Sequence, residues 1–304
     1  MKYYIGIDLG GTNVRTLLVD ENGESYSEVK GPTECGNGPD YVCDKIIKQI
    51  ESLDTSVCGG LQGVEGIGIG APGPVDTELG IMIMASNLPG FENYPICHKL
   101  KEKFGLPTFI DNDANVAGLA EAVLGAGKDY KTNYFITCST GVGGAFVVDK
   151  KLVSGGRGHA GEIGNMILVP GGYKQGALNP GAVEGEISGT ALTRKGKEAK
   201  GDLVKHAGDV FKLAAEGDEA CQKIAEEFID GFSTLLANVA HTVDPHCFVL
   251  GGVFKSKAYF WDELEKRFNS KIHVGMRNHI PLLFKEIDDC GAIGAAMLPM
   301  SQLD

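Results

Sequence analysis

Two glycine-rich turns carry residue types that could hold the phosphates of a nucleotide. The first reads Asp8-Leu9-Gly10-Gly11-Thr12-Asn13, and the second reads Ser139-Thr140-Gly141-Val142-Gly143-Gly144. Glycines let backbone N–H groups come close to phosphate oxygens, and threonine hydroxyls can donate to the same oxygens. The carboxylate of Asp8 could orient a hydrated Mg²⁺ beside them. A plain glycine hairpin would explain either turn alone, but the pair indicates a site for ATP and Mg²⁺.

A carboxylate that could act as a general base stands at Asp113, in the segment Asn112-Asp113-Ala114-Asn115. This segment follows an apolar strand and opens a predicted helix. An aspartate in this place commonly caps the helix N-terminus. Alternatively, Asp113 could take the proton of a sugar hydroxyl as that hydroxyl attacks the γ-phosphate, a role worth about 10²–10⁴ in rate. Position alone leaves both interpretations open.

The apolar pattern predicts the elements that position these residues, and it predicts them in two rounds. Both glycine turns join two strands, so each is a β-hairpin and not the strand-to-helix turn of a dinucleotide-binding or Walker loop. The first round has strands at 2–9, 14–20, 24–30, 66–70 and 108–111, with helices at 39–53, 95–104 and 114–125. The second round has strands at 134–138, 145–148, 151–154, 247–250 and 282–286, with helices at 217–242, 259–269 and 291–298. Two such rounds predict two related α/β domains that face one another across a central cleft.

Composition excludes several classes of protein. The chain of 304 residues has an apolar share of 43% and a net charge of −12, which argues against a nucleic-acid surface. Its eight cysteines form no C-x-x-C pair, and with no signal peptide we expect reduced thiols. No apolar run approaches the roughly 18–20 residues that a membrane span needs. We therefore expect a soluble, cytoplasmic protein that acts on small molecules.

The order of these elements resembles the actin, sugar kinase and heat-shock chaperone superfamily, whose members hold ATP between two domains of ribonuclease-H-like topology. In that superfamily Leu250-Gly251-Gly252-Val253 matches the adenosine motif, in which Gly251 and Gly252 let the backbone lie against the nucleoside. The segment Asn112-Asp113-Ala114-Asn115-Val116-Ala117 resembles the catalytic motif of one branch, the ROK family (repressors, open reading frames and kinases). The resemblance implies that Asp113 is the base and that Asn112 holds the sugar.

Further segments resemble the sugar-binding loops of the ROK family. Ala71-Pro72-Gly73-Pro74-Val75-Asp76 would offer a backbone contact at Gly73, and Ser86-Asn87-Leu88-Pro89-Gly90-Phe91 would offer Asn87. Gly158-His159-Ala160-Gly161-Glu162-Ile163-Gly164-Asn165 resembles the family signature, in which the glutamate accepts hydrogen bonds from sugar hydroxyls. The resemblance implies a second sugar-binding glutamate at Glu184. Without the family, Glu162 and Glu184 would be interpreted as solvated surface charges.

The chain departs from the family at its metal site. Most ROK proteins carry a structural zinc ion held by one histidine and three cysteines. At the aligned positions this chain has Asn165, Gln175, Ala177 and Ala182. None of these side chains offers a thiolate or an imidazole, so we predict a loop without zinc. In zinc-bearing relatives the histidine also touches the sugar near its anomeric oxygen, so Asn165 leaves the choice of sugar open.

The resemblance covers essentially the whole chain and implies an ATP-dependent hexose kinase that acts on the 6-hydroxyl, with glucose as the first candidate. N-acetylmannosamine, allose, fructose and β-glucosides are the alternative acceptors. It implies an N-terminal domain at 1–117 plus 291–304, a C-terminal domain at 118–290, and a possible homodimer. A sugar-responsive repressor would place a winged-helix segment before the first phosphate motif, which here begins at Ile5, and the acidic charge disfavours it. An activator or chaperone-like ATPase would not need Asn112 and Asp113 together with two sugar-binding glutamates.

Overall fold

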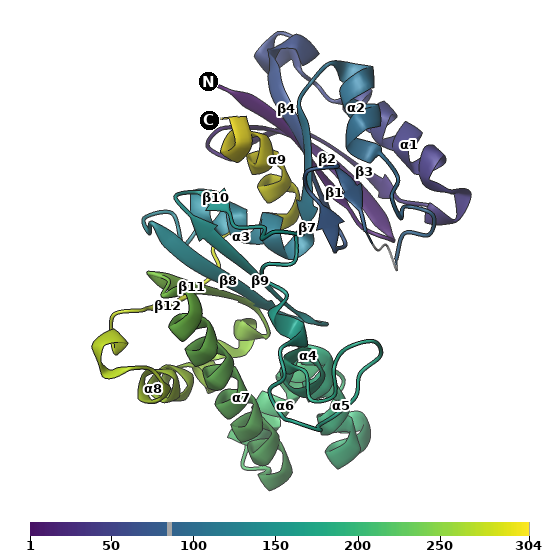
Figure 1. The fold of residues 1–304 in the computed structure, drawn as a ribbon. Coiled ribbons are helices and arrows are strands. Elements are labelled where there is room, and N and C mark those ends of the chain that lie inside the picture. Colours follow the sequence, from purple (N-terminus) through teal and green to yellow (C-terminus); the bar gives the residue numbers. More distant parts are fainter. Residues whose placement is uncertain (84–86, 304) are drawn as a thin grey trace. The chain divides into compact units, whose positions relative to one another are not determined.

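The computed structural model describes residues 1–83 and 87–303, and its two five-stranded sheets with flanking helices confirm the predicted α/β class (Figure 1). Ser86, which the sequence places in a sugar-binding loop, lies outside the described residues. The chain divides into two compact units. Unit 1 comprises Met1–Lys131, Ala145–Gly161 and Glu286–Asp304, and unit 2 comprises Thr132–Gly144 and Glu162–Lys285. Unlike the division expected from the sequence, this one assigns residues 118–131, 145–161 and 286–290 to the first unit.

The first sheet has the strand order β3-β2-β1-β4-β7. Its strands are β1 (Tyr3–Leu9), β2 (Asn13–Asp20), β3 (Ser25–Pro32), β4 (Val64–Ala71) and β7 (Thr108–Asn112). The first three pair as antiparallel neighbours, whereas β4 and β7 continue the sheet in parallel with β1. A small hairpin of β5 (Val75–Asp76) and β6 (Ile81–Met82) follows β4.

Helices cover both faces of this sheet. They are α1 (Pro39–Ser52), α2 (Ile96–Phe104), α3 (Asp113–Val123) and α9 (Cys290–Leu303). Side chains alternate along a strand, so Ile5 packs in the cluster with α1 and α2, whereas Tyr4 packs in the cluster with α3 and α9. On the second face a Cβ at Gly6 or Gly68 would overlap the backbone of α9. These glycines therefore allow α9 to lie directly on the sheet.

The second sheet repeats this arrangement with the strand order β10-β9-β8-β11-β12. Its strands are β8 (Thr132–Cys138), β9 (Val142–Val148), β10 (Lys151–Leu152), β11 (Cys247–Gly252) and β12 (Leu282–Phe284). β9 and β10 pair as antiparallel neighbours, and β11 runs parallel to both β8 and β12. In each sheet the strands follow the order third, second, first, fourth and fifth along the chain. The internal repeat predicted from the sequence is therefore confirmed.

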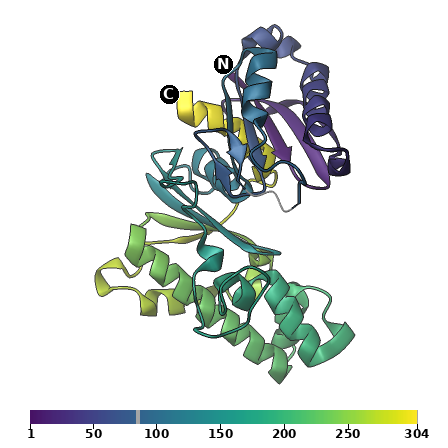
Figure 2. The ribbon, with the colours of Figure 1, turned by 45° about the vertical axis from the view of Figure 1, so that its right-hand side comes forward.

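Unit 2 carries five α-helices among the described residues. They are α4 (Val183–Ile187), α5 (Gly189–Lys200), α6 (Ala207–Ala215), α7 (Glu219–Val243) and α8 (Trp261–Lys271). α7 and α8 lie side by side (Figures 1 and 2), and the ring of Phe228 in α7 meets that of Phe211 in α6 edge to face, with 5.3 Å between the ring centroids. The sequence pattern does not predict α4, α5 or α6. In α5 the reason is a weak apolar stripe, because its buried residues are only Ala191, Leu192 and Gly196.

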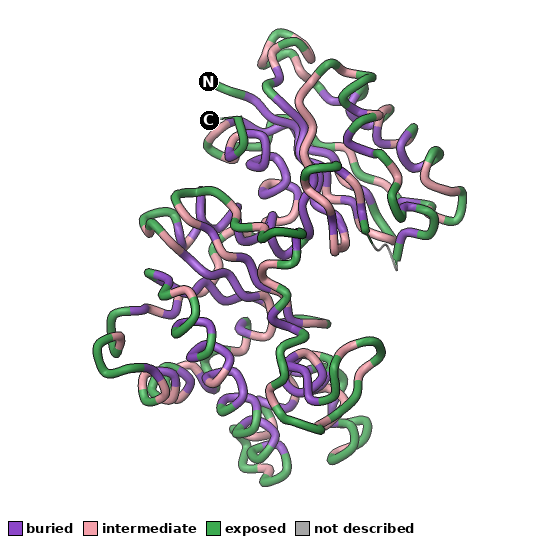
Figure 3. Tube along the Cα trace, viewed as in Figure 1, coloured by how far each residue is buried: buried purple, intermediate pink, exposed green. Residues whose placement is uncertain are grey.

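Burial within each unit is concentrated where helices meet strands (Figure 3). Ile5 and Ile7 of β1 are fully buried, as are Phe248 and Val249 of β11. Phe232 of α7 is fully buried, which places at least this part of the helix in the core of unit 2. No helix within residues 1–83 and 87–303 is both long enough and apolar enough to cross a membrane.

Candidate active site

In unit 1, three parallel strands bring predicted site residues to one edge of the sheet. The register pairs Asp8 of β1 with Gly70 of β4, and Gly70 with Asp111 of β7. The segments that follow the carboxyl ends of these strands hold the first glycine turn, Gly73, and the pair Asn112–Asp113. Ligands of open α/β sheets bind at this edge. The structure thus gathers the phosphate turn and the candidate base in one unit.

Acidic side chains are concentrated at this edge. Asp113 is exposed at the start of α3, yet the protein around it displaces enough water to raise its pKa. Asp8 is half-buried, and its pKa is raised chiefly by burial and then by the negative charges of Asp289 and Asp113. Arg15 opposes that shift and forms ion pairs with Asp289 and with Glu28. Sequence reasoning missed Asp289, because nothing in its local pattern separates it from an ordinary loop carboxylate.

The helix cap at this site is Asn112 and not Asp113. The Oδ1 atom of Asn112 accepts the backbone N–H of Asn115 at 2.7 Å. The interpretation of Asp113 as the cap is therefore wrong, because Asp113 occupies the first helical position. A Cβ at Gly73 would lie 2.9 Å from the Cβ of Asn112, so the predicted sugar loop packs against this cap. The side-chain N–H₂ of Asn112 has no partner in the described part of the chain and is available to a hydroxyl.

The side chain of Asp111 holds the end of β7 in place through hydrogen bonds. It is buried and accepts the N–H of Asn112 at 2.8 Å and the side-chain N–H₂ of Asn115 at 2.7 Å. Burial raises the pKa of Asp111, while these donors lower it. The sequence places Asp111 only at the end of a strand. Its contacts identify it as the group that holds the Asn112–Asp113 pair in position.

The first glycine turn is closed by a hydrogen bond from the N–H of Gly10 to the carbonyl of Asn13 at 3.0 Å. Thr12 and Asn13 are exposed, so the hydroxyl of Thr12 can reach a phosphate oxygen. A Cβ at Gly11 would overlap the carbonyl oxygen of Asn87. The structure therefore brings Asn87, predicted to contact the sugar, against the turn predicted to hold phosphate.

The second glycine turn lies in unit 2, where the N–H of Ser139 donates to the carbonyl of Gly141 at 2.8 Å. Thr140 is exposed at its tip, and Gly143 lies just beyond it in β9. The N–H of Gly189, the first residue of α5, donates to the carbonyl of Ser139 at 2.7 Å. The positive end of the α5 dipole is thus adjacent to the turn, which favours an anionic ligand there.

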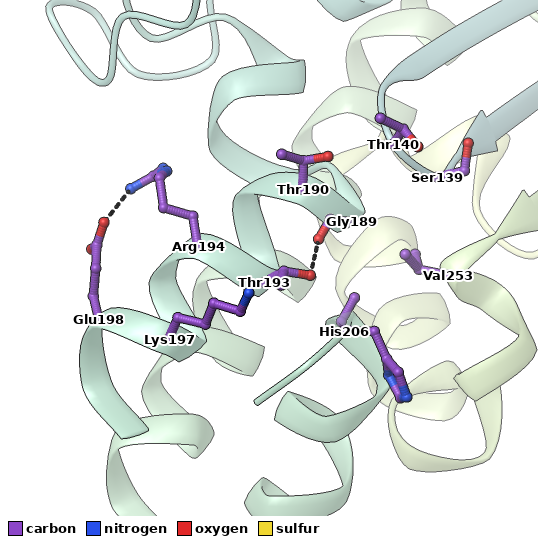
Figure 4. A pocket seen from close by; sticks show the side chains of 11 residues that line it. Ser139, Thr140, Gly189, Thr190, Thr193, Arg194, Lys197, Glu198, His206 and Val253 are labelled. Atoms are coloured by element: carbon purple, nitrogen blue, oxygen red, sulfur yellow. Dashed lines mark hydrogen bonds and ion pairs between the residues drawn. The ribbon is translucent and has the colours of Figure 1, made fainter. Parts of the chain in front are cut away.

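A pocket of about 680 Å³ opens beside this turn, with all of its lining residues in unit 2 (Figure 4). Its lining residues are Ser139, Thr140, Gly189, Thr190, Thr193, Arg194, Lys197, Glu198, His206, Ala207 and Val253. Val253 directly follows Gly251 and Gly252, the predicted adenosine motif at the end of β11. Gly252 has a φ of +80°, and a Cβ there would overlap the carbonyl of Cys138, so only glycine fits. The residues that α5 contributes were missed together with the helix.

The two predicted sugar-binding glutamates are held very differently. Glu162 is exposed, and its carboxylate has no hydrogen-bond or ion-pair partner within residues 1–83 and 87–303. Glu184 is half-buried, and its two oxygens accept the N–H of Val142 at 3.0 Å and the side-chain N–H₂ of Gln175 at 3.1 Å. Asn165 is exposed, and its Oδ1 accepts the backbone N–H of Asn179 at 2.8 Å.

Metal ions place different demands on these residues. Within the part of the chain that the structure describes, no group of three or more His, Cys, Asp or Glu side chains is arranged to hold a metal. Mg²⁺ needs only one or two protein carboxylates, since water and phosphates supply its other ligands. Asp8 fits that demand, because its oxygens lie among negative charges that a cation would neutralise. Asn165 and Gln175 do not fit zinc, because their neutral amides offer neither a thiolate nor an imidazole; the absence of zinc stays a prediction.

Comparison with known proteins gives matches along nearly the whole chain. The model of the ROK family matches residues 4–302. A glucokinase of Halalkalibacterium halodurans is 30% identical, over 99% of this chain and 96% of its own. The structure of a ROK hexokinase from Thermus thermophilus is 30% identical with a TM-score of 0.85, and the match covers 97% of each chain. A ROK glucokinase from Streptomyces griseus, solved with glucose and AMPPNP, is 29% identical with a TM-score of 0.75, covering 97% of this chain and 98% of its own.

Proposed function

This chain belongs to the ROK family and is an ATP-dependent sugar kinase, and we propose that it phosphorylates the 6-hydroxyl of a hexose, with glucose preferred. The relatives named as glucokinases support glucose as the acceptor. One observation carries the proposal. The exposed carboxylate of Asp113 stands at the same edge of the sheet as the phosphate turn that follows β1.

On the acceptor side, Asp113 takes the proton of the attacking hydroxyl. Burial raises its pKa, which makes the ionised carboxylate a stronger base than that of an ordinary aspartate. The side-chain N–H₂ of Asn112 donates to a neighbouring sugar oxygen. Glu162 and Glu184 accept hydrogen bonds from the other hydroxyls, and each carboxylate can take several O–H donors. Asn87 and the backbone at Gly73 complete the acceptor contacts.

On the donor side, the pocket in unit 2 takes the nucleoside, and Gly251 and Gly252 directly precede its lining residue Val253. The exposed Thr140 and the N-terminus of α5 contact the phosphates, where hydrogen bonds and the helix dipole favour negative charge. Mg²⁺, held through water by Asp8, would neutralise the charge that develops on the phosphates during transfer. The residues of the chain position the two substrates, and positioning supplies most of the rate enhancement in phosphoryl transfer.

The same chemistry on another acceptor is the alternative. Relatives of similar identity are named β-glucoside kinase, in Listeria monocytogenes, and N-acetylmannosamine kinase, in Shigella boydii. Asn165 bears on this choice, because its Oδ1 already accepts the N–H of Asn179 and leaves mainly N–H donors for a sugar. A β-glucoside keeps an oxygen at its anomeric carbon, and the N–H donors of Asn165 can bind that oxygen.

The test is an ADP-release screen of the purified protein with ATP and Mg²⁺ over hexoses, N-acetylhexosamines and glycosides. We expect glucose to give the highest kcat/KM and the product to be the 6-phosphate. Hexose-independent ADP release, or sugar binding without any ADP release, would favour an ATPase or a regulator instead. A preferred sugar whose turnover survives the Asp113→Ala substitution would remove Asp113 from the role of base. Light scattering on the same sample tests the predicted homodimer.

A further inference from the structure

The carboxylate of Glu184 is enclosed by two loops of unit 2. One oxygen, Oε2, accepts the N–H of Val142 at 3.0 Å, at the point where the second glycine turn enters β9. A Cβ at Gly141 would overlap this oxygen, and a Cβ at Gly164 would lie 3.5 Å from it. The glycine turn can therefore lie directly on the carboxylate only because Gly141 lacks a side chain, whereas a Cβ at Gly164 would overlap the carbonyl of Val142.

Gln175 holds the other oxygen of Glu184. The side-chain N–H₂ of Gln175 donates to Oε1 at 3.1 Å, and the backbone carbonyl of Gln175 accepts the N–H of Leu178 at 3.0 Å. Four residues after Gln175, the N–H of Asn179 donates to Oδ1 of Asn165 at 2.8 Å. The loop that carries Gln175 is thus pinned by amide hydrogen bonds at both ends.

Glu184 retains capacity for a ligand although both oxygens are engaged. An ionised carboxylate offers about four acceptor positions, and these contacts use two of them. The proposed sugar contact and the bond to the turn of Thr140, Gly141 and Val142 therefore belong to one side chain. A shift of this carboxylate would displace the acceptor contact and the donor turn together.

We propose that Gln175 is a positioning residue: it fixes the carboxylate of Glu184, and Glu184 in turn fixes the backbone of the donor turn at Val142. The consequence for catalysis rests on the proposed function, whereas the consequence for the turn does not. Hydrogen bonds to a charged acceptor are stronger than neutral ones, which suits this amide to the task. Gln175 itself touches neither substrate in this proposal.

The first measurement is hydrogen exchange at the amide of Val142, made without substrates in the full chain. Gln175→Ala removes a bond worth about 1 kcal/mol, so we expect exchange at Val142 to accelerate about five-fold. Gln222, which is exposed on α7, offers a matched control, and Gln222→Ala should leave this amide unchanged. Unchanged exchange at Val142 in Gln175→Ala, with the protein folded, would overturn the proposal.

The second measurement compares the pH profiles of Gln175→Glu and the wild type in the ADP-release assay. At low pH the introduced carboxyl is protonated and can donate to Glu184 as the amide does. As the pH rises, two adjacent carboxylates repel, so the activity of the variant relative to wild type should fall. Gln175→Ala should instead lower kcat/KM for the sugar about five-fold at every pH.

A purely structural role would predict a constant ratio of Gln175→Glu to wild-type activity across the pH range, and that result would also overturn the proposal. Gln222→Glu adds the same charge elsewhere and should keep a ratio near one throughout. If the wild type releases no ADP with any sugar, the proposed function fails on its own. The exchange rate at Val142 then still decides whether Gln175 positions the turn.

Discussion

The carboxylate of Asp113 lies near enough to Asp8, within unit 1, for its negative charge to raise the pKa of Asp8. Burial and the negative charge of Asp289 raise that pKa more than Asp113 does, and Arg15, which pairs with Asp289, offsets the repulsion only in part. Clustered carboxylates with shifted pKa values are typical of functional sites, where a ligand relieves the repulsion. This relationship leads to the first two predictions.

Asp8→Asn should stabilise the protein at neutral pH while it lowers kinase activity. The raised pKa means that ionising Asp8 opposes folding; the penalty is absent below the ordinary value of about 3.9 and complete above the raised pKa. Thermal unfolding at pH 7 should show a melting temperature higher by about 2 °C, and the difference should disappear near pH 3. Mg²⁺ should raise the melting temperature of the wild type more than that of the variant. A variant that melts earlier at pH 7 would contradict the prediction.

Asp113→Asn should lower kcat about 10²–10⁴-fold, with a much smaller change in KM for ATP. Burial favours the neutral carboxyl, so the base loses its charge at a pH above the ordinary aspartate value of about 3.9. The wild-type rate should therefore fall on the acid side through that raised pKa, and the residual rate of the variant should lack this limb. Asp44→Asn, on the exposed face of α1, is the control and should retain both rate and profile. A variant with the wild-type acid limb would exclude Asp113 as its source.

Gly11→Ala should impair the site without unfolding unit 1. The added Cβ would overlap the carbonyl of Asn87, so the phosphate turn and the sugar loop must move apart. Overpacking of this kind costs about 1–3 kcal/mol, and we expect kcat/KM for both substrates to fall at least about ten-fold. Gly36→Ala is the matched control, because a Cβ at Gly36 meets nothing within 4 Å. Equal kinetics for the two alanine variants would show that the contact with Asn87 is unimportant.

Val253→Trp should block the nucleotide and spare the sugar. Val253 lines the pocket in unit 2, and the larger ring would occupy space that the nucleoside needs. We expect KM for ATP to rise at least about ten-fold, because the tryptophan ring would clash with the bound nucleoside. Calorimetric titration of the sugar without nucleotide should give the wild-type affinity. Val274→Trp, at an exposed valine of the same unit, should change neither value; a normal KM for ATP in Val253→Trp would place the nucleoside elsewhere.

Features that depend on local chain chemistry could be predicted from the sequence. The two glycine turns were recognisable because apolar strands flank them, and the helix expected at 39–53 is observed at Pro39–Ser52. The position of Asp113 at a strand end was also predictable, because the strand Thr108–Asn112 lies between two helices along the chain. The repeat was recognisable because each round supplies three hairpin-connected strands, but the strand order of the two sheets is known from the structure alone.

Features that depend on tertiary packing could not be predicted. Arg194 and Lys197 of α5 line the pocket. The sequence of this cation-rich helix does not show which of its faces packs against the rest of the unit. The cap at Asn112 and the charge of Asp289 beside Asp8 depend on where the chain returns in space. Gln175 lies in a loop without periodicity, so no pattern could assign Glu184 of α4 as its partner.

The side chain of Glu162 is exposed and makes no bond that folding depends on within the described residues, and the same is true of the side chain of Asn87. Exposed positions of this kind tolerate substitution with little loss of stability. Directed-evolution libraries for new acceptors can therefore randomise these two codons and still recover mostly folded clones. The same randomisation at Glu184 would discard most of the library, because each clone would also lose the support of its donor turn.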